Sequence, residues 1–250
     1  MLKKSFKKII PAFLAAMVIT TPAVQAESPH EFSANVAITT DYRFRGISQT
    51  NEDPAIQGGF DYAYAPYSFY AGVWASSLEF GLGAPDNAST EMDFYGGFAG
   101  DYNGVAWDVG GLYYYYPGHD NGPGSVDFDY FEVYGSLGYD FGIFNVTGGL
   151  AYSPDYFAET DTFFYYYGDF GVPLNVWGLS LSGHVGYSDI DDEVGFGAPS
   201  YTDYSFGVSK DIGAFTFDVS YVDTDLDDTE CFGGTDLCDA TAVFTVSAAF

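Results

Sequence analysis

Apolar side chains occupy every second position up to the last residue of the chain, at Ala242, Phe244, Val246, Ala248 and Phe250. The positions between them carry smaller or more polar side chains. This period of two predicts a β-strand with one apolar face. An exposed terminal aromatic residue is unusual in soluble domains and typical of bacterial outer-membrane barrels, so the rest of the sequence must decide between these two classes.

Eleven further segments have the same alternation, and no apolar run of 18 residues follows residue 26. Glycine recurs through the apolar segments, and Tyr, Phe, Val and Thr dominate where helix formers are scarce. This composition favours strands over helices. The twelve expected strands cover about 32–45, 55–64, 67–78, 91–102, 104–116, 128–140, 142–153, 162–173, 177–188, 201–210, 213–223 and 240–250.

The connections between these segments alternate in length. Short turns lie at 65–66, 101–104, 140–142, 173–175 and 210–213, and longer acidic loops near 46–54, 79–90, 117–127, 154–161, 189–200 and 224–239. An even strand number with both chain ends on the short-turn side is the layout of bacterial outer-membrane barrels. We therefore expect an all-β fold, a transmembrane antiparallel up-and-down β-barrel of about 12 strands, with a soluble β-sandwich as the alternative.

Outward aromatic residues give a second test of this topology. Strand direction places one group near the long loops and another near the short turns, as the two surfaces of a bilayer require. The first group comprises Tyr42, Tyr113, Tyr152, Tyr187 and Tyr221, and the second Tyr62, Tyr64, Tyr102, Tyr139 and Phe250. A sandwich does not predict two such belts.

The first 26 residues have the features of a secretory signal. Four lysines precede an apolar run from Ile9 to about Thr20, and small residues follow at Val24 and Ala26. The run is too short to span roughly 30 Å of hydrocarbon comfortably, which disfavours a retained anchor. We expect residues 1–26 to be a removed signal peptide and residues 27–250 to form one barrel domain in the bacterial outer membrane.

The chain is strongly acidic, with 35 Asp and Glu against 7 Lys and Arg. Removal of residues 1–26 would take four lysines and leave a formal net charge of −32. The remaining cations would be Arg43, Arg45 and Lys210. Because nucleic-acid binding depends on neutralised phosphates, this balance argues against nucleic acid and disfavours polyanionic substrates.

The face opposite the apolar one would line the barrel interior. By parity the pore-lining residues are Asp41, Arg43, Arg45, Gln57, Asp61, Asp93, Asp108, Glu132, Asp169, Asp203 and Asp218. So many carboxylates would be costly in a dry interior, and a wet lumen of this charge favours cations. Arg43 and Arg45 either form an eyelet opposite acids or pair with acids to hold the barrel together. Inward tyrosines such as Tyr95 and Tyr165 either line a sugar or nucleoside track or fill the interior.

Other residues suggest chemistry that the strand pattern does not require. Cys231 and Cys238 lie in the last long loop, where an oxidising compartment favours a disulfide. His184 shares a strand face with three serines, but the lipase-type Gly-x-Ser-x-Gly element is missing, which disfavours catalysis. Acidic runs at 189–193 and 223–230 suit at most a loose association with Ca²⁺ or Mg²⁺. We expect neither a metal centre nor a cofactor.

The first hairpin resembles a known family. Residues 40–50, Thr-Asp-Tyr-Arg-Phe-Arg-Gly-Ile-Ser-Gln-Thr, and residues 54–62, Pro-Ala-Ile-Gln-Gly-Gly-Phe-Asp-Tyr, are similar to the opening of the TorF-type putative porin family. The resemblance continues through 69–76 and, more loosely, through 91–98. It implies a bacterial outer-membrane protein of channel function, names no substrate and carries over no catalytic residues.

These features together predict a porin-like channel for passive diffusion of ions and small cationic or neutral solutes. Twelve strands lie between filled barrels of about 8 and wide porins of 16 to 18, which limits the pore. The alternatives are a closed structural or adhesive barrel with acidic surface loops and, less favoured, an outer-membrane lipid hydrolase. Expected partners are outer-membrane lipids and lipopolysaccharide, small solutes, and the barrel-assembly machinery through the strand ending at Phe250.

Overall fold

The computed structural model describes residues 28–80, 88–119, 126–174 and 176–250. Twelve of the strands in these residues form a closed antiparallel barrel. They are β1 (His30–Thr39), β4 (Ala55–Tyr64), β5 (Phe69–Ser77), β6 (Thr90–Tyr102), β7 (Val105–Tyr115), β8 (Tyr130–Asp140), β9 (Asn145–Ser153), β10 (Phe163–Pro173), β11 (Leu179–Ile190), β12 (Tyr201–Ile212), β13 (Phe215–Thr224) and β14 (Thr241–Ala249). Each of them pairs with its sequence neighbours in the barrel, and β1 closes the ring against β14.

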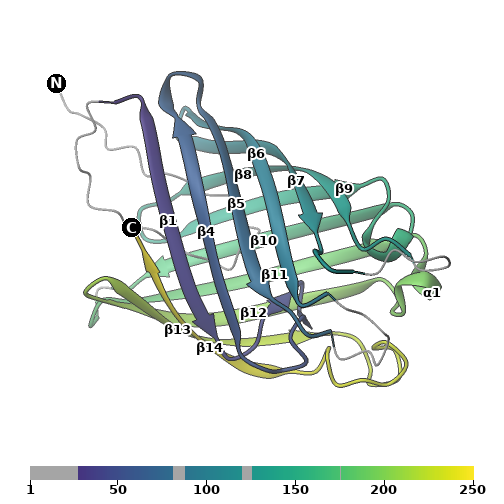
Figure 1. Cartoon of the computed structure of the whole chain (residues 1–250). Helices are drawn as coiled ribbons and strands as arrows, with labels where there is room; N and C mark the ends of the chain where they lie inside the picture. The colour runs from purple at the N-terminus through teal and green to yellow at the C-terminus, as the bar shows by residue number, and fades with distance from the viewer. Residues whose placement is uncertain (1–27, 81–87, 120–125, 175) are drawn as a thin grey trace.

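The closed twelve-stranded barrel confirms the expected fold class. All expected strands after the first agree with the observed bounds to within three residues. Figure 1 shows that β1 begins and β14 ends at the same end of the barrel, which we call the short-turn end, whereas α1 (Glu193–Phe196) lies at the opposite, long-loop end. The expected signal peptide, residues 1–26, lies outside the described residues.

Large apolar side chains face outward from the wall, as the period of two requires. Exposed examples include Val36, Phe60, Phe98, Val109, Leu137, Val185, Phe206 and Val219. The aromatic belts retain exposed members at both ends, with Tyr113, Tyr187 and Tyr221 toward the long loops and Tyr102, Tyr139 and Phe250 toward the short turns. The outer surface of the barrel is therefore apolar with aromatic margins.

The first expected strand is wrong beyond Thr39. Residues 40–54 fold into the barrel as a segment that we call the plug hairpin, which contains the paired strands β2 (Arg43–Phe44) and β3 (Ile47–Ser48). Its turn has positive φ angles at Arg45 (49°) and Gly46 (83°), the pattern of a type I′ turn. A Cβ at Gly46 would lie 2.9 Å from the Cβ of Asp203, so only glycine fits against the wall.

Tyr42, expected in the outer belt, is a second correction that follows from the first. Only 8% of its surface is exposed, because the hairpin carries it into the interior. Its ring packs edge-on against Trp74, with 5.4 Å between ring centroids. The alternation could not reveal this change of direction, since the plug hairpin is itself extended and keeps a period of two.

The helices of the described residues are short connections. They are η1 (Ala65–Tyr67), η2 (Phe157–Glu159) and α1. None of the helices in this part of the chain has the length and apolar character needed to cross a membrane. In the last long loop, Cys231 and Cys238 form a disulfide.

Candidate functional site

The barrel interior differs between its two ends. Toward the short turns, most inward side chains are polar and half-buried, although Asp108 and Ser247 are buried. The half-buried ones include Ser33, Asn35, Asp61, Tyr70, Thr147, Asp169, His184, Ser205, Asp218, Ser220 and Thr245. Toward the long loops the inward side chains are buried, and they include Ser76, Glu91, Asp93, Tyr114, Tyr130, Glu132, Ser153, Phe163, Ser188, Tyr201, Asp203 and Thr224. We call these regions the accessible half and the filled half. The short-turn end of the interior is therefore the more solvent-exposed of the two.

Tyrosine rings in the interior lie flat over glycines of the neighbouring strand. Asp61, Gly72 and Tyr95 form one row across β4, β5 and β6. A Cβ at Gly72 would lie 2.5 Å from the Tyr95 ring, and the Tyr95 hydroxyl donates a hydrogen bond to Asp61. Glycine in this row makes room for the ring, a recognised role of glycine within strands. The ring therefore lies against the wall.

The same arrangement recurs around the barrel. Tyr167 lies over Gly149, with which it is paired in the β9–β10 register. Tyr165 leans over Gly186 and donates to Asp203 at 3.0 Å. From the sequence, inward tyrosines could either fill the interior or line it. These rings lie along the inner surface of the wall, so they line the interior.

Asp108 lies at the junction of two facing tyrosines. The Tyr70 hydroxyl donates to Asp108 at 2.7 Å and also contacts the Tyr134 hydroxyl. These two tyrosines reach toward each other over Gly97 and Gly110. The second carboxylate oxygen of Asp108 is buried and has no hydrogen-bond partner among the described residues. In several of these rows, a tyrosine hydroxyl thus donates a hydrogen bond to an interior aspartate.

His184 contacts acids and not the serines of its own strand. Its Nδ1 lies 2.6 Å from Asp169 Oδ1, and its Nε2 lies 3.1 Å from Asp203 Oδ1 and 2.7 Å from the Tyr165 hydroxyl. Both ring nitrogens are thus engaged, which leaves neither to accept a proton from a serine hydroxyl. This geometry does not support a serine nucleophile at His184.

Arg45 of the plug hairpin reaches into a closed cage on the wall. Its Nη2 donates to both carboxylate oxygens of Glu132, at 2.8 and 2.9 Å. Arg45 is 7% exposed and Glu132 is 0% exposed. Removing one partner of a buried, charge-assisted pair is costly, because the other charge then stays buried without compensation. The pair therefore fixes the tip of the plug hairpin to β8.

Four aromatic rings complete this cage. The guanidinium carbon lies 4.6 Å from the ring centre of Phe44, 5.7 Å from Tyr156, 4.7 Å from Phe163 and 4.4 Å from Tyr165. These distances are those of cation–π contacts. Burial raises the pKa of the Tyr156 hydroxyl to about 12, so this loop residue stays neutral beside Arg45. We call Glu132, Phe44, Tyr156, Phe163 and Tyr165 the Arg45 cage.

Arg43 binds a different set of groups, most of them outside the wall. Its guanidinium pairs with Asp41 and Glu52 of the plug hairpin itself. It also donates to the Leu237 carbonyl at 2.7 Å, in the loop closed by the Cys231–Cys238 disulfide. Arg43 therefore ties the plug hairpin to the last long loop.

The expected pore-lining residues fall into three places. The plug hairpin carries Asp41, Arg43 and Arg45. The filled half carries Asp93, Glu132 and Asp203, and Gln57 lies beside Ser76 at the same end. Further along the strands, toward the short turns, lie Asp61, Asp108, Asp169 and Asp218. Sequence reasoning missed Glu91, which accepts a hydrogen bond from the Tyr42 hydroxyl at 2.7 Å. The parity of Asp93, two residues on, could have identified it. Tyr156 lies in a loop, where the period-two pattern does not apply, so the sequence could not place it in the interior.

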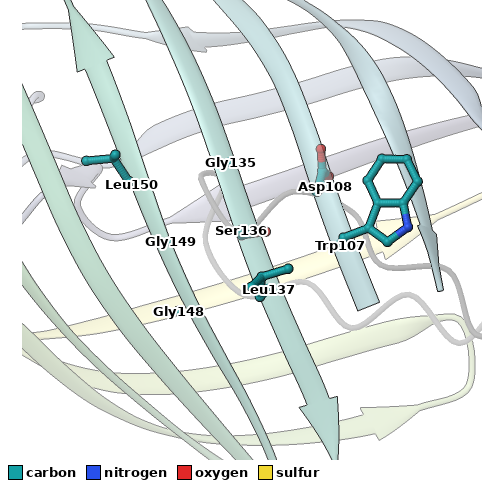
Figure 2. A pocket seen from close by; sticks show the side chains of 8 residues that line it. All are labelled: Trp107, Asp108, Gly135, Ser136, Leu137, Gly148, Gly149 and Leu150. Atoms are coloured by element: carbon teal, nitrogen blue, oxygen red, sulfur yellow. The ribbon is translucent and has the colours of Figure 1, made fainter. Parts of the chain in front are cut away.

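The hollows of the described residues include one beside the plug hairpin and one along the wall. A cavity of about 50 Å³ lies between the plug hairpin and long-loop aromatic residues, including Phe157 and Phe232, and has room for one or two waters. A hollow of about 390 Å³ lies along β7, β8 and β9, where Trp107, Leu137 and Leu150 stand around Gly135 and Gly148 (Figure 2).

In the described ranges, groups of three or more His, Cys, Asp or Glu suited to a metal ion are not found.

Comparisons with known proteins agree with the barrel. The sequence model of a family described as "Bacterial protein of unknown function (Gcw_chp)" matches residues 23–250. A comparison with curated proteins gives no significant match. The structure is similar to that of the NanC porin, with a TM-score of 0.55, 8% sequence identity, and coverage of 88% of this chain and 99% of that one.

Two further solved structures are less similar. A porin refined at 1.8 Å resolution has a TM-score of 0.43 at 13% identity, over 88% of this chain and 100% of the porin. LpxR from Salmonella typhimurium has a TM-score of 0.47 at 9% identity, over 87% of this chain and 99% of LpxR. At these identities, the comparison with NanC establishes a common fold and no more.

Proposed function

The chain belongs to the Gcw_chp family of bacterial proteins of unknown function, and we propose that it is an outer-membrane channel for passive diffusion of ions and small cationic or neutral solutes. The apolar outer surface with aromatic margins supports a place in the membrane. The resemblance of residues 40–50 and 54–62 to the TorF-type putative porins supports the same assignment. Export through a cleaved signal peptide, and insertion through the strand ending at Phe250, belong to this proposal.

The observation that carries the proposal is the accessible half. Its wall exposes carboxylates and hydroxyls to solvent, and the tyrosine rings lie flat over glycines instead of crossing the interior. Asp61, Asp169 and Asp218 are half-buried there. Both arginines of the described chain lie in the plug hairpin, where each is paired with a carboxylate. A water-filled path with this charge attracts cations and repels anions.

The plug hairpin is the constriction of this channel. In the described structure it occupies the filled half, where Glu132 and Asp93 are almost completely buried. Conduction therefore requires the plug hairpin to shift. Its side-chain attachments include Arg45 on β8 and Arg43 on the last long loop.

Planar-bilayer recording tests the proposal. The refolded mature chain is expected to give current steps with a K⁺-favouring reversal potential under a KCl gradient. Replacing Asp61, Asp169 and Asp218 together with Asn should move that potential toward zero. The matched control removes the same charge from exposed loop positions, Asp191, Asp227 and Asp228, and should leave the reversal potential nearly unchanged.

Correct folding is checked by the heat-dependent gel mobility of the barrel. A folded wild-type barrel that conducts no current under any applied voltage contradicts the channel. That outcome favours the second candidate, a closed structural or adhesive barrel, because the filled half would then be permanently shut. Current without cation preference would retain the channel and reject the role given to the three aspartates.

A further inference from the structure

The Arg45 cage belongs mainly to the barrel wall. Glu132 lies on β8, Phe163 and Tyr165 lie on β10, and Tyr156 lies in the loop between β9 and β10. Among the five cage residues, Phe44 alone belongs to the plug hairpin. The carboxylate and three of the four rings therefore remain in place when the plug hairpin withdraws.

The chemistry of this cage selects a flat organic cation. Ring faces attract a cation, and a planar guanidinium can stack on them while its N–H groups point at a carboxylate. Glu132 is fully buried, and among the described residues it also accepts a long hydrogen bond, 3.4 Å, from the Tyr114 hydroxyl. A buried carboxylate that loses its cation is costly, so the emptied cage would favour a replacement cation.

Arg43 offers a contrast within the same hairpin. Its partners are Asp41 and Glu52 of the plug hairpin together with backbone carbonyls, including that of Leu237. Two of these groups move with Arg43 when the hairpin moves. The surroundings of Arg43 are therefore those of a structural tie, whereas those of Arg45 form a preformed site on the wall.

We propose that the Arg45 cage is a binding site for solutes that carry a guanidinium group, and that Arg45 occupies it as an internal mimic while the plug hairpin is seated. This inference rests on the proposed channel function and names a substrate class for it. A guanidinium solute that enters from the accessible half competes with Arg45 for Glu132. Its binding releases the tip of the plug hairpin.

Chemical replacement of the Arg45 side chain tests the site. Arg45→Gly empties the cage, and glycine readily adopts the positive φ of 49° found there, so the turn is retained. Guanidinium chloride at millimolar concentration should raise the thermal unfolding midpoint of this variant by about 2–4 °C. Urea, a neutral molecule of the same shape, and NaCl at equal concentration should not raise it.

Two controls assign the effect to the cage. The double variant Arg45→Gly/Glu132→Gln should show no response to guanidinium, because the carboxylate is gone. Arg43→Ala loosens the same hairpin at its contact with the last long loop, but Arg45 still fills the cage. Guanidinium should therefore not raise the unfolding midpoint of this variant. A folded Arg45→Gly barrel without a guanidinium-specific shift overturns the inference, and so does an equal shift in the Glu132→Gln double variant.

A second measurement uses the unaltered chain and does not depend on the folding of a variant. Guanidinium should increase tryptic cleavage after Arg43 and Arg45, relative to cleavage of a small chromogenic trypsin substrate under the same conditions. No increase over urea counts against displacement of the plug hairpin. Current recording separates the two proposals: conduction without guanidinium binding rejects this inference alone, and guanidinium binding by a silent barrel rejects the channel alone.

Discussion

At the scale of single residues, the interior depends on small side chains placed beside large ones. Gly149 allows the Tyr167 ring to lie on the wall, and Gly72 does the same for Tyr95. These glycines have ordinary extended conformations, so their value lies in the space that they leave. Glycine can therefore recur within these strands without breaking them where a tyrosine ring fills the space.

Gly149→Ala should destabilise the barrel by about 1–3 kcal/mol, because the added methyl group overlaps the Tyr167 ring. The neighbouring Gly148→Ala is the matched control. A Cβ there would have no contact shorter than 3.8 Å and would point to the opposite face. Urea unfolding from lipid vesicles measures both variants. Equal effects of the two substitutions would show that the ring does not need the glycine.

Glu132→Gln should be strongly destabilising, by about 3–5 kcal/mol, because it leaves the Arg45 guanidinium buried without its counter-charge. Adding Arg45→Gly to Glu132→Gln should recover part of this loss, since the unpaired charge is then removed. The double-mutant cycle is measured by urea unfolding, as guanidinium itself would bind the cage. Additive losses would mean that the two groups do not act as a pair.

At the scale of elements, the plug hairpin is held by its two arginines in different ways. Arg45 binds the wall, and Arg43 binds a loop that is closed by the Cys231–Cys238 disulfide. The Ser48 amide also donates to the Leu237 carbonyl of that loop, at 2.9 Å. The position of the plug hairpin is therefore coupled to the order of the last long loop.

Replacing Cys231 and Cys238 with Ser should loosen that loop, because the disulfide restricts the chain by roughly 2–3 kcal/mol in the loop-entropy description. The expected results are more frequent current openings and faster tryptic cleavage after Arg43. A reducing agent should have the same effect on the wild type. It should leave the openings and the cleavage rate of the double Ser variant unchanged. Identical opening frequencies with and without the disulfide would show that the last long loop does not influence the plug hairpin.

The sequence predicted the strands well and the plug hairpin not at all. Period-two burial applies to every wall strand, so eleven of the twelve segments fall within three residues of their observed bounds. The same period continues through Tyr42, Arg43 and Phe44 while the chain leaves the wall, because β2 and β3 are extended too. Pattern alone cannot tell an outward apolar face from one buried in the interior.

The candidate site was predictable in composition but not in arrangement. Parity predicts that Glu132 and both arginines face inward, and the sequence allows either an eyelet or pairing of the arginines with acids. The Arg45 cage joins residues 44 and 165, which only the closed barrel brings together. Long-range proximity of this kind has no local signal in a single sequence.

At the scale of the whole molecule, the structure combines an accessible acidic half with a half that is filled by the plug hairpin. In the proposed channel, the acidic half would favour cations and the filled half would limit the conductance of the resting state. These two properties belong to different parts of the barrel, so they should respond to different substitutions. Loss of lumen carboxylates should change selectivity, whereas loss of the hairpin attachments should change opening.

The most direct test compares single-channel currents of the wild type and of the Arg43→Ala/Arg45→Ala variant under one KCl gradient. Both should show a K⁺-favouring reversal potential, and the variant should open more often or conduct more current, with heat-dependent gel mobility unchanged. A folded variant that stays silent, or one whose currents match those of the wild type, would contradict a channel constricted by the plug hairpin.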